Sequence, residues 1–207
     1  MKVELLTITP NAEKHIENAG RTSYQSFEKQ TKDSYKNFIK MIVKRGHESV
    51  LEHAFASFRI SKVSRALTHQ LVRHRLCSFT QKSQRYVDEK NFNYIEPEDI
   101  KNNIEAHNIY FELMEDIRKK YKQLRDFGIK KEDARYILPN STTSELVMTA
   151  NFRELRHFIK LRGEKAAQRE IRNLAINILK ILKEEVPEVF QDMVIDEKTQ
   201  TVKIKSL

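Results

Sequence analysis

A basic stretch without acids stands in the middle of the chain. Residues 71–87 read LVRHRLCSFTQKSQRYV, and neither Asp nor Glu occurs among them. Five of these side chains carry cationic or imidazole nitrogen: Arg73, His74, Arg75, Lys82 and Arg85. Guanidinium groups present a fixed fork of donors that meets phosphate or carboxylate oxygens two at a time. The stretch therefore predicts an anion-binding site.

The elements expected around this stretch decide which groups can bind the anion. Residues 73–75 fall at or just beyond the carboxyl end of an expected helix, where the macrodipole is negative, so side chains must do the binding. In the extended segment expected next, Ser83 and Arg85 alternate onto one face and Gln84 points to the other. A phosphate or carboxylate held by Ser83 and Arg85 fits this spacing.

The charge balance leaves two interpretations open. Lys and Arg number 38 against 29 Asp and Glu, a formal net charge of +9. This excess is spread along the chain, so it indicates an anionic partner without separating a small molecule from a polymer, and a basic nucleic-acid-binding module is the alternative hypothesis. RNA-binding surfaces usually alternate aromatic and basic residues, but only Phe79 and Tyr86 are aromatic in 71–87.

Length and composition favour one domain over residues 1–207. The hydrophobic content of 39% supports a core, and no Pro-, Gly- or Ser-rich linker interrupts the chain. Cys77 is the only cysteine, which excludes an intrachain disulfide framework and agrees with a reducing compartment. The amino terminus is too short and polar for a signal peptide, and no apolar run reaches the length of a membrane span. We therefore expect a cytoplasmic protein without membrane contact.

Hydrophobic periodicity predicts an α+β fold, a single domain with a small, mainly antiparallel sheet flanked by long helices. Strands are expected at 2–8, 53–60 and 144–150, with a hairpin at 194–204. Helices are expected near 11–19, 33–45, 61–74 and 99–127, and from about 171 to Pro187. Gly46 and Gly128 are expected to end helices, and Asn151 to cap one. The sheet is too small to cover every apolar helix face, which favours a subunit interface.

Five sequence blocks occur in an order that resembles the flavin-dependent thymidylate synthases. The first is Arg-His-Arg followed, after seven residues, by Ser83 in 71–87. The others are AGRTSYQSF at 19–27, GHESVLEH at 46–53, ARYILP at 134–139 and NFRELRHFIKLRGEKAAQREI at 151–171. Together they span about residues 19–187. A single such motif would be weak support, but five in order make chance agreement improbable.

This resemblance implies a reaction, its cofactors and an assembly. It implies that dUMP is methylated to dTMP with methylenetetrahydrofolate as carbon donor, and that FAD reduced by NADPH supplies the hydride. It also implies a homotetramer whose sites are built across subunits, with the 81–85 segment supplied by a different subunit from Gln70 and Arg73. The basic excess then serves anionic small molecules, and no nucleic-acid partner is expected.

The resemblance also implies roles for particular residues. dUMP would be bound by Gln70, Arg73, Gln81, Ser83, Gln84, Arg85, Arg135 and Arg162. FAD would be contacted by Ser49, Arg73, His74, Arg75, Gln81, Asn151, Arg153 and His157. Folate or NADPH would stack near His47 and Tyr86. Arg162 would be the catalytic residue, because a fixed cation beside the uracil ring favours its ionised, electron-rich form.

Departures and absences qualify this set. Gln81 stands where many members of that family have Glu, and His157 where Asn is more usual. Only four glycines occur, and none forms the Gly-x-Gly-x-x-Gly of a Rossmann cofactor loop. The segment HESVLEH at 47–53 lacks the i, i+4 histidine pair of a zinc helix, so no metal is expected. Cys77 has no evident base partner and is not expected to act as a nucleophile.

Overall fold

The computed structural model describes all of residues 1–207, and the chain forms two compact units, each built from distant segments. Unit 1 comprises Met1–Lys2, Ile60–Gln70 and Thr80–Leu146. Unit 2 comprises Val3–Arg59, Leu71–Phe79 and Val147–Leu207. The organisation as one domain over 1–207 stays a prediction.

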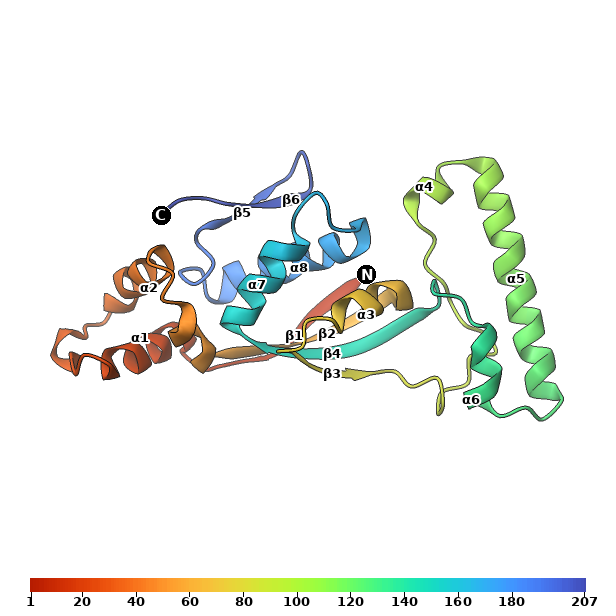
Figure 1. Ribbon diagram of the computed structural model, residues 1–207, viewed down its shortest axis with the longest axis horizontal. Coiled ribbons are helices and arrows are strands. Elements are labelled where there is room, and N and C mark those ends of the chain that lie inside the picture. The colour runs from red at the N-terminus through yellow and green to blue at the C-terminus, as the bar shows by residue number, and fades with distance from the viewer. The chain divides into compact units, whose positions relative to one another are not determined.

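The expected α+β class is confirmed, with a small antiparallel sheet and several helices (Figure 1). Four strands form the sheet in the order β1 (Lys2–Ile8), β2 (Phe55–Ser64), β4 (Thr143–Asn151) and β3 (Ser78–Gln81). Alternate residues of β4 are buried, as expected for a strand with one covered face: Ser144, Leu146, Met148 and Ala150. The predicted strands at 2–8 and 144–150 are therefore confirmed.

The predicted helix at 61–74 is too long at both ends. β2 continues to Ser64, and α3 covers only Arg65–Leu71. Lys62 has a φ of +56°, outside the right-handed helical region, and the Ser64 Oγ accepts the Leu67 N–H at 3.0 Å. These two features set the start of α3 after Ser64. Residues 73–75 lie just beyond its carboxyl end, as predicted.

In unit 1, the long helix predicted at 99–127 is interrupted near its start. α4 (Glu98–Lys101) ends before Asn103, whose side chain accepts the Glu105 and Ala106 N–H groups at 3.1 Å and caps α5 (Ile104–Asp126). The N-cap thus begins a new helix where the apolar period alone suggested continuity. Gly128, with a φ of +83°, follows the end of α5 as predicted. Two short elements come next, α6 (Lys131–Ala134) and the 3₁₀ turn η3 (Arg135–Ile137).

Unit 2 packs its helices against one another and against short 3₁₀ turns. α1 (Ala12–Thr22) contacts α2 (Ser34–Lys44) and η2 (Glu48–His53), and η1 covers Phe27–Lys29. α7 (Phe152–Arg162) contacts η2 and α8 (Arg169–Glu185). α8 buries its predicted apolar stripe: Ile171, Leu174, Ile178 and Leu182. The predicted hairpin is confirmed as β5 (Met193–Asp196) and β6 (Thr201–Ile204), and β6 contacts α7 and α8.

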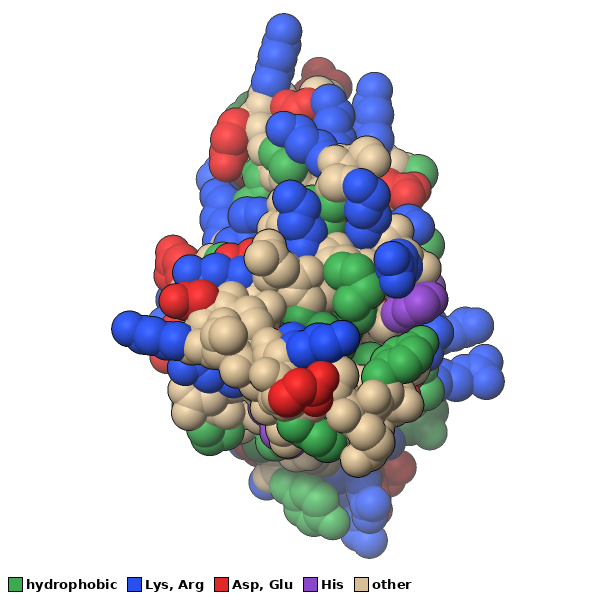
Figure 2. All heavy atoms as spheres, turned by 90° about the vertical axis from the view of Figure 1, so that its left-hand side faces the viewer, with side chains coloured by type: hydrophobic (Ala, Val, Ile, Leu, Met, Phe, Trp, Pro, Cys, Tyr) green, Lys and Arg blue, Asp and Glu red, His purple; other side chains and the backbone are tan.

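Surface charge follows the composition. Figure 2 shows Lys and Arg side chains spread over the face that carries α1 and α2, with fewer Asp and Glu among them. None of the helices combines the length and the apolar character that a membrane crossing requires.

Candidate active site

A cleft in unit 1 brings two arginines together. The cleft has a volume of about 280 Å³, and its lining includes Arg65, His69, Gln84 and Arg135. α3 supplies Arg65 and His69 one helical turn apart, and η3 supplies Arg135 directly after α6. The Arg135 Nε donates to the Glu132 carbonyl at 3.0 Å, which orients its guanidinium. No acidic side chain lines the cleft.

The electrostatics of this cleft favour an anion. Burial lowers the pKa of Arg65, and the positive charge of Arg135 lowers it further, while Glu89 opposes the shift. Two guanidinium groups that repel each other in a cleft without an acidic lining residue are stabilised by a ligand that carries negative charge. Phosphate matches them, because each guanidinium can donate to two of its oxygens.

Gln81, at the end of β3, uses its amide within the protein. Its Nε2 donates to Thr68 Oγ1 at 3.1 Å and to Ser144 Oγ at 2.8 Å. Both amide hydrogens are therefore engaged, and a ligand would meet the carbonyl oxygen of this side chain. A Glu at this position would have no hydrogens for these two hydroxyls, so the Gln suits its local partners.

The segment after β3 corrects one prediction. The strand ends at Gln81, and residues 83–87 form a turn in which Tyr86 N and Val87 N donate to the Ser83 carbonyl at 3.3 and 3.0 Å. The Ser83 Oγ also accepts the Arg85 N–H at 3.2 Å. The alternating geometry that placed Ser83 and Arg85 on one extended face is therefore wrong, because a hydroxyl-stabilised turn replaces the strand. Gln84 is buried in this turn and Arg85 is exposed.

Three side chains of unit 2 form a chain of polar contacts: Glu154, His74 and Arg162. His74 is 5% exposed, and its Nδ1 lies 3.1 Å from Glu154 Oε1. Its Nε2 lies 3.1 Å from the Nε of Arg162. Glu154 and Arg162 both belong to α7, so one helix holds the two groups that engage the imidazole. Both ring nitrogens of His74 are thus used within the protein.

Close packing at the end of α7 fixes the position of Arg162. The next residue, Gly163, is buried, and a Cβ there would lie 2.6 Å from Val202 Cγ2 and from the Ile159 carbonyl. The Val202 N–H donates to the Gly163 carbonyl at 2.8 Å. Only glycine lets β6 approach this closely, so the hairpin anchors the turn that carries Arg162.

Cys77 lies beside the same carboxylate and is unsuited to nucleophilic attack. The thiol is 9% exposed, and its Sγ lies 3.9 Å from Glu154 Oε1. Burial raises the pKa of Cys77 to about 12, and the negative charge of Glu154 adds to the effect. The thiol is therefore neutral at physiological pH, which agrees with the expectation that it is not a nucleophile.

Other residues predicted to contact the flavin lie on the surface of unit 2. Exposed side chains among them are Ser49, Arg73, Arg75, Arg153 and His157, and His47 is also exposed. Arg153 pairs with Glu52 at 2.5 Å. Asn151 caps α7 as predicted, because its Oδ1 accepts the Glu154 N–H at 2.9 Å. Its amide nitrogen is the group that remains for other contacts.

A buried ionic cluster supports the segment that bears His47 and Ser49. Arg156 donates to Glu48 at 3.0 Å and to both carboxylate oxygens of Asp192 at 2.7 Å. It also donates to the Val189 carbonyl at 2.6 Å. The cluster ties η2 to α7 and to the segment before β5.

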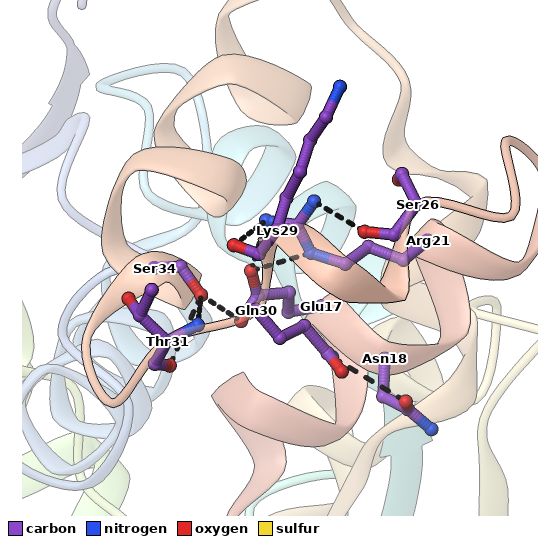
Figure 3. A network of polar contacts seen from close by, with 8 residues as sticks. All are labelled: Glu17, Asn18, Arg21, Ser26, Lys29, Gln30, Thr31 and Ser34. Carbon is purple, nitrogen blue, oxygen red and sulfur yellow. Dashed lines mark hydrogen bonds and ion pairs between the residues drawn. The ribbon is translucent and has the colours of Figure 1, made fainter.

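A second network organises residues 23–33, which follow the AGRTS motif (Figure 3). The buried Arg21 donates to Glu17 Oε1 at 2.9 and 2.6 Å, and reaches the carbonyls of Ser26 and Lys29 at 3.2 and 3.4 Å. Ser34 Oγ donates to the other Glu17 oxygen at 2.9 Å. The Arg21 side chain therefore holds the loop between α1 and α2 through carbonyl groups of the loop. It also lines a cavity of about 490 Å³, together with Phe38 and Met41.

The sequence-predicted residues divide between the two units. Unit 1 holds Gln70, Gln81, Ser83, Gln84, Arg85, Tyr86 and Arg135, and unit 2 holds His47, Ser49, Arg73, His74, Arg75, Asn151, Arg153, His157 and Arg162. Sequence reasoning missed Arg65 and His69 in the cleft, and Glu154 beside His74. The i, i+4 spacing of Arg65 and His69 was a usable signal. Glu154 gave no signal in the sequence, because its partner His74 is distant in sequence.

The structure gathers no group of three His, Cys, Asp or Glu side chains that could hold a metal ion.

Comparisons with known proteins agree with this architecture. The family model described as "Thymidylate synthase complementing protein" matches residues 4–188. The flavin-dependent thymidylate synthase of Geobacter sulfurreducens is 38% identical over 200 residues, covering 93% of this chain and 86% of its own. That of Pyrococcus abyssi is 45% identical over 161 residues, covering 76% and 66%. A crystal structure of thymidylate synthase X from Helicobacter pylori with FAD and dUMP has a TM-score of 0.78 at 27% identity, covering 93% of this chain and 98% of that one.

The α+β fold and a cleft lined by two guanidinium groups are those of a protein that binds anionic ligands. The family model that matches residues 4–188, and a relative of 38% identity over most of both chains, identify the family. This chain belongs to the flavin-dependent thymidylate synthase family.

Proposed function

We propose that this protein methylates dUMP to dTMP with methylenetetrahydrofolate as carbon donor and FAD, reduced by NADPH, as hydride source. The unit 1 cleft is the observation that carries the proposal. The cleft offers a ligand the guanidinium groups of Arg65 and Arg135, and its lining contains no acid. A nucleotide phosphate can accept hydrogen bonds from both guanidinium groups. Gln84, which lines the same cleft, would add an amide contact.

The nucleotide-binding set proposed for this enzyme comes from the family resemblance. It comprises Gln70, Arg73, Gln81, Ser83, Gln84, Arg85, Arg135 and Arg162, to which we add Arg65. Arg85 is exposed and pairs with Glu132 at 3.3 Å. An exposed pair of this kind is weak, so Arg85 can exchange its carboxylate partner for a phosphate at little expense.

Arg162 is the proposed catalytic residue. Its Nε is fixed by His74 at 3.1 Å, and a guanidinium held in one orientation can donate to a uracil carbonyl and favour the ionised imide. Preorganised charge is effective in catalysis because the protein has already oriented it before the reaction begins. The chemistry at the ring then needs no covalent bond from the protein, in agreement with the neutral Cys77.

The residues of unit 2 fit a flavin dinucleotide by charge and by donor type. FAD would supply the hydride that completes the methyl group. Arg73 and Arg75 are exposed on either side of buried His74, and their forks suit a pyrophosphate in a chain that lacks a glycine-rich loop. Ser49, Asn151, Arg153 and His157 would add hydrogen bonds. His74 would contribute only the second acceptor position of its carbonyl, since its ring nitrogens and its N–H are engaged within the protein. His47 and Tyr86 are exposed and would stack against folate or NADPH.

The same proposal includes a homotetramer with sites shared between subunits. Large apolar side chains of α5 are exposed, among them Ile104 at 71% and Ile109 at 70%. Exposed apolar faces of this kind mark protein interfaces. Light scattering on the purified protein checks the assembly, and a monomer at micromolar concentration would contradict it.

Product formation tests the proposed function directly. The purified protein should appear yellow, and should release tritium from [5-³H]dUMP and form dTMP only with methylenetetrahydrofolate and NADPH present. Omission of each component is the control that assigns its role. Absence of dTMP by mass spectrometry, in protein that binds FAD, would contradict the proposal. The comparisons give no support to the nucleic-acid-binding alternative, and a gel-shift assay with RNA and DNA tests it independently.

A further inference from the structure

Glu154 occupies an unusual position for an acid. It is 5% exposed and lies in the first turn of α7. No arginine or lysine is paired with its carboxylate: its partners are the His74 ring at 3.1 Å and the Cys77 thiol at 3.9 Å. A buried carboxylate is unfavourable unless hydrogen bonds hold it. The position of Glu154 therefore calls for a role that a neutral residue would not fill.

The donors and acceptors around His74 determine where its proton lies. Arg162 has only N–H donors on its guanidinium, so the Nε2 of His74 must be the acceptor in their 3.1 Å contact. The proton of a neutral imidazole is then on Nδ1, which donates to Glu154. A carboxylate is an acceptor only, and it therefore selects this tautomer over the alternative.

The geometry along α7 makes this selection act on Arg162. Glu154, Phe158 and Arg162 follow one another at i, i+4 and i+8, on one side of the helix. The ring of Phe158 meets the imidazole edge-on, with centroids 5.0 Å apart. The imidazole thus lies between Glu154 and Arg162. Because its Nε2 contacts the Arg162 Nε, the orientation of the ring determines the orientation of the guanidinium.

We propose that Glu154 is a positioning residue for the reaction: by holding His74 as the Nδ1–H tautomer, it keeps Nε2 as the acceptor that orients Arg162 toward the uracil ring. The inference deepens the proposed function and rests on it for the role of Arg162. It requires no contact between Glu154 and any ligand. Besides Glu154 and Arg162, the titratable group facing the imidazole is His157 on α7, while Cys77 contacts the Glu154 carboxylate.

Two substitutions of Glu154 separate its acceptor from its volume. Glu154→Leu keeps the bulk and removes the acceptor for Nδ1–H, so the ring also populates the tautomer with a proton on Nε2, in which that N–H would face the Arg162 Nε–H and break the contact. We expect kcat for dTMP formation to fall about 10²-fold, the size of effect that follows misplacement of a catalytic group, with KM for dUMP close to wild type. Glu154→Gln keeps an oxygen acceptor that can also rotate away, so its kcat should lie between those of wild type and Glu154→Leu.

Phe158→Leu is the matched control, because it alters packing against the same ring without changing a hydrogen bond. It should lower thermal stability and leave kcat near wild type. If Phe158→Leu reduces kcat as much as Glu154→Leu, the effect is one of packing and the proposal is overturned. Wild-type kcat in Glu154→Leu overturns it as well.

A spectroscopic measurement on the wild-type protein does not depend on the variants folding. Proton–nitrogen NMR of protein labelled with ¹⁵N-histidine, with His74 assigned by the resonance missing from His74→Gln, should show Nδ1 protonated and Nε2 unprotonated at neutral pH. A proton on Nε2 would overturn the proposal. Because this readout needs no turnover, it also separates the two claims: a protein that makes no dTMP but has this tautomer refutes the proposed function and leaves the positioning geometry intact.

Discussion

The arginines of the two units differ in whether carboxylates of the protein bind them. In unit 1, Arg65 and Arg135 both line a cleft that has no acid in its lining. In unit 2, Arg156 is buried with its guanidinium bound by Glu48 and by both oxygens of Asp192. The first arrangement leaves positive charge available for a ligand, and the second uses all of it to hold the protein together.

Arg162 lies between these two extremes. Its Nε contacts an imidazole nitrogen at 3.1 Å, and this contact orients the guanidinium from one edge. A carboxylate does act on this site, but Glu154 reaches it only through the ring of His74. The Nε edge of a residue that must be both fixed and cationic is thereby held by an imidazole. The comparison predicts that arginines of the three kinds respond differently to substitution.

Arg162→Ala should produce the largest change. Loss of the oriented cation beside the uracil ring should lower kcat for dTMP formation by about 10³-fold or more, as for removal of an oxyanion-stabilising donor. FAD absorbance of the purified protein should remain, because the proposed flavin contacts lie elsewhere in unit 2. Arg162→Lys serves as control and should recover little activity, since an ammonium cannot reproduce the planar fork. Near-normal turnover in Arg162→Ala would refute its catalytic role.

Asp192→Ala should mainly affect stability. It leaves the buried Arg156 with Glu48 as its only carboxylate partner, and breaking a buried pair costs about 3–5 kcal/mol in the free energy of unfolding. Urea denaturation measures the change. Glu52→Gln is the control, because it removes one partner of the exposed Arg153 pair and should not change the urea midpoint measurably. Equal midpoints for the two variants would mean that burial does not distinguish these pairs.

Substitution in the unit 1 cleft should weaken nucleotide binding and leave the fold intact. Arg65→Ala and Arg135→Ala should each raise KM for dUMP by about 10- to 100-fold, from the loss of a charged hydrogen bond worth about 1.5–3 kcal/mol. Thermal stability should stay the same or rise slightly, since each variant removes the repulsion between two like charges. Lower stability with unchanged KM would reverse the roles assigned to the two units.

Local patterns predicted most of the fold, and failed where a side chain capped or turned the backbone. Asn103 divides the helix expected at 99–127, and Ser83 converts an expected strand into a turn, in both cases through a side-chain oxygen that hydrophobic periodicity does not register. Asn151, by contrast, was predictable because it immediately precedes a periodic helix.

The candidate site was predictable from motifs only where its residues cluster in sequence. Arg73, His74 and Arg162 belong to recognisable blocks. The contact between His74 and Glu154 joins residues that are 80 positions apart, and Arg65 becomes part of a cleft only when η3 brings Arg135 to it. Tertiary contacts of this kind depend on how elements pack, and one sequence carries no direct signal for them.

Cys77→Ala should have the smallest effect and tests whether the polar chain around Glu154 contains a nucleophile. The thiol lies against Glu154 and has its pKa raised to about 12 by burial and by that negative charge, so almost no thiolate exists at neutral pH. Activity of the alanine variant should stay close to wild type, and alkylation of the native protein should be slow and should accelerate only as pH approaches 12.

The raised pKa of Cys77 also determines how this thiol changes the stability of the fold with pH. The folded thiol keeps its proton up to about pH 12, whereas the unfolded thiol loses it near its ordinary pKa of 9.0. Cys77 therefore destabilises the fold progressively as pH rises through that window and contributes nothing below it. Cys77→Ala should therefore be less sensitive to alkaline denaturation between those two pH values, measured by circular dichroism against wild type. Loss of dTMP formation in this variant, with FAD and dUMP still bound, would show that the thiol takes part in the chemistry.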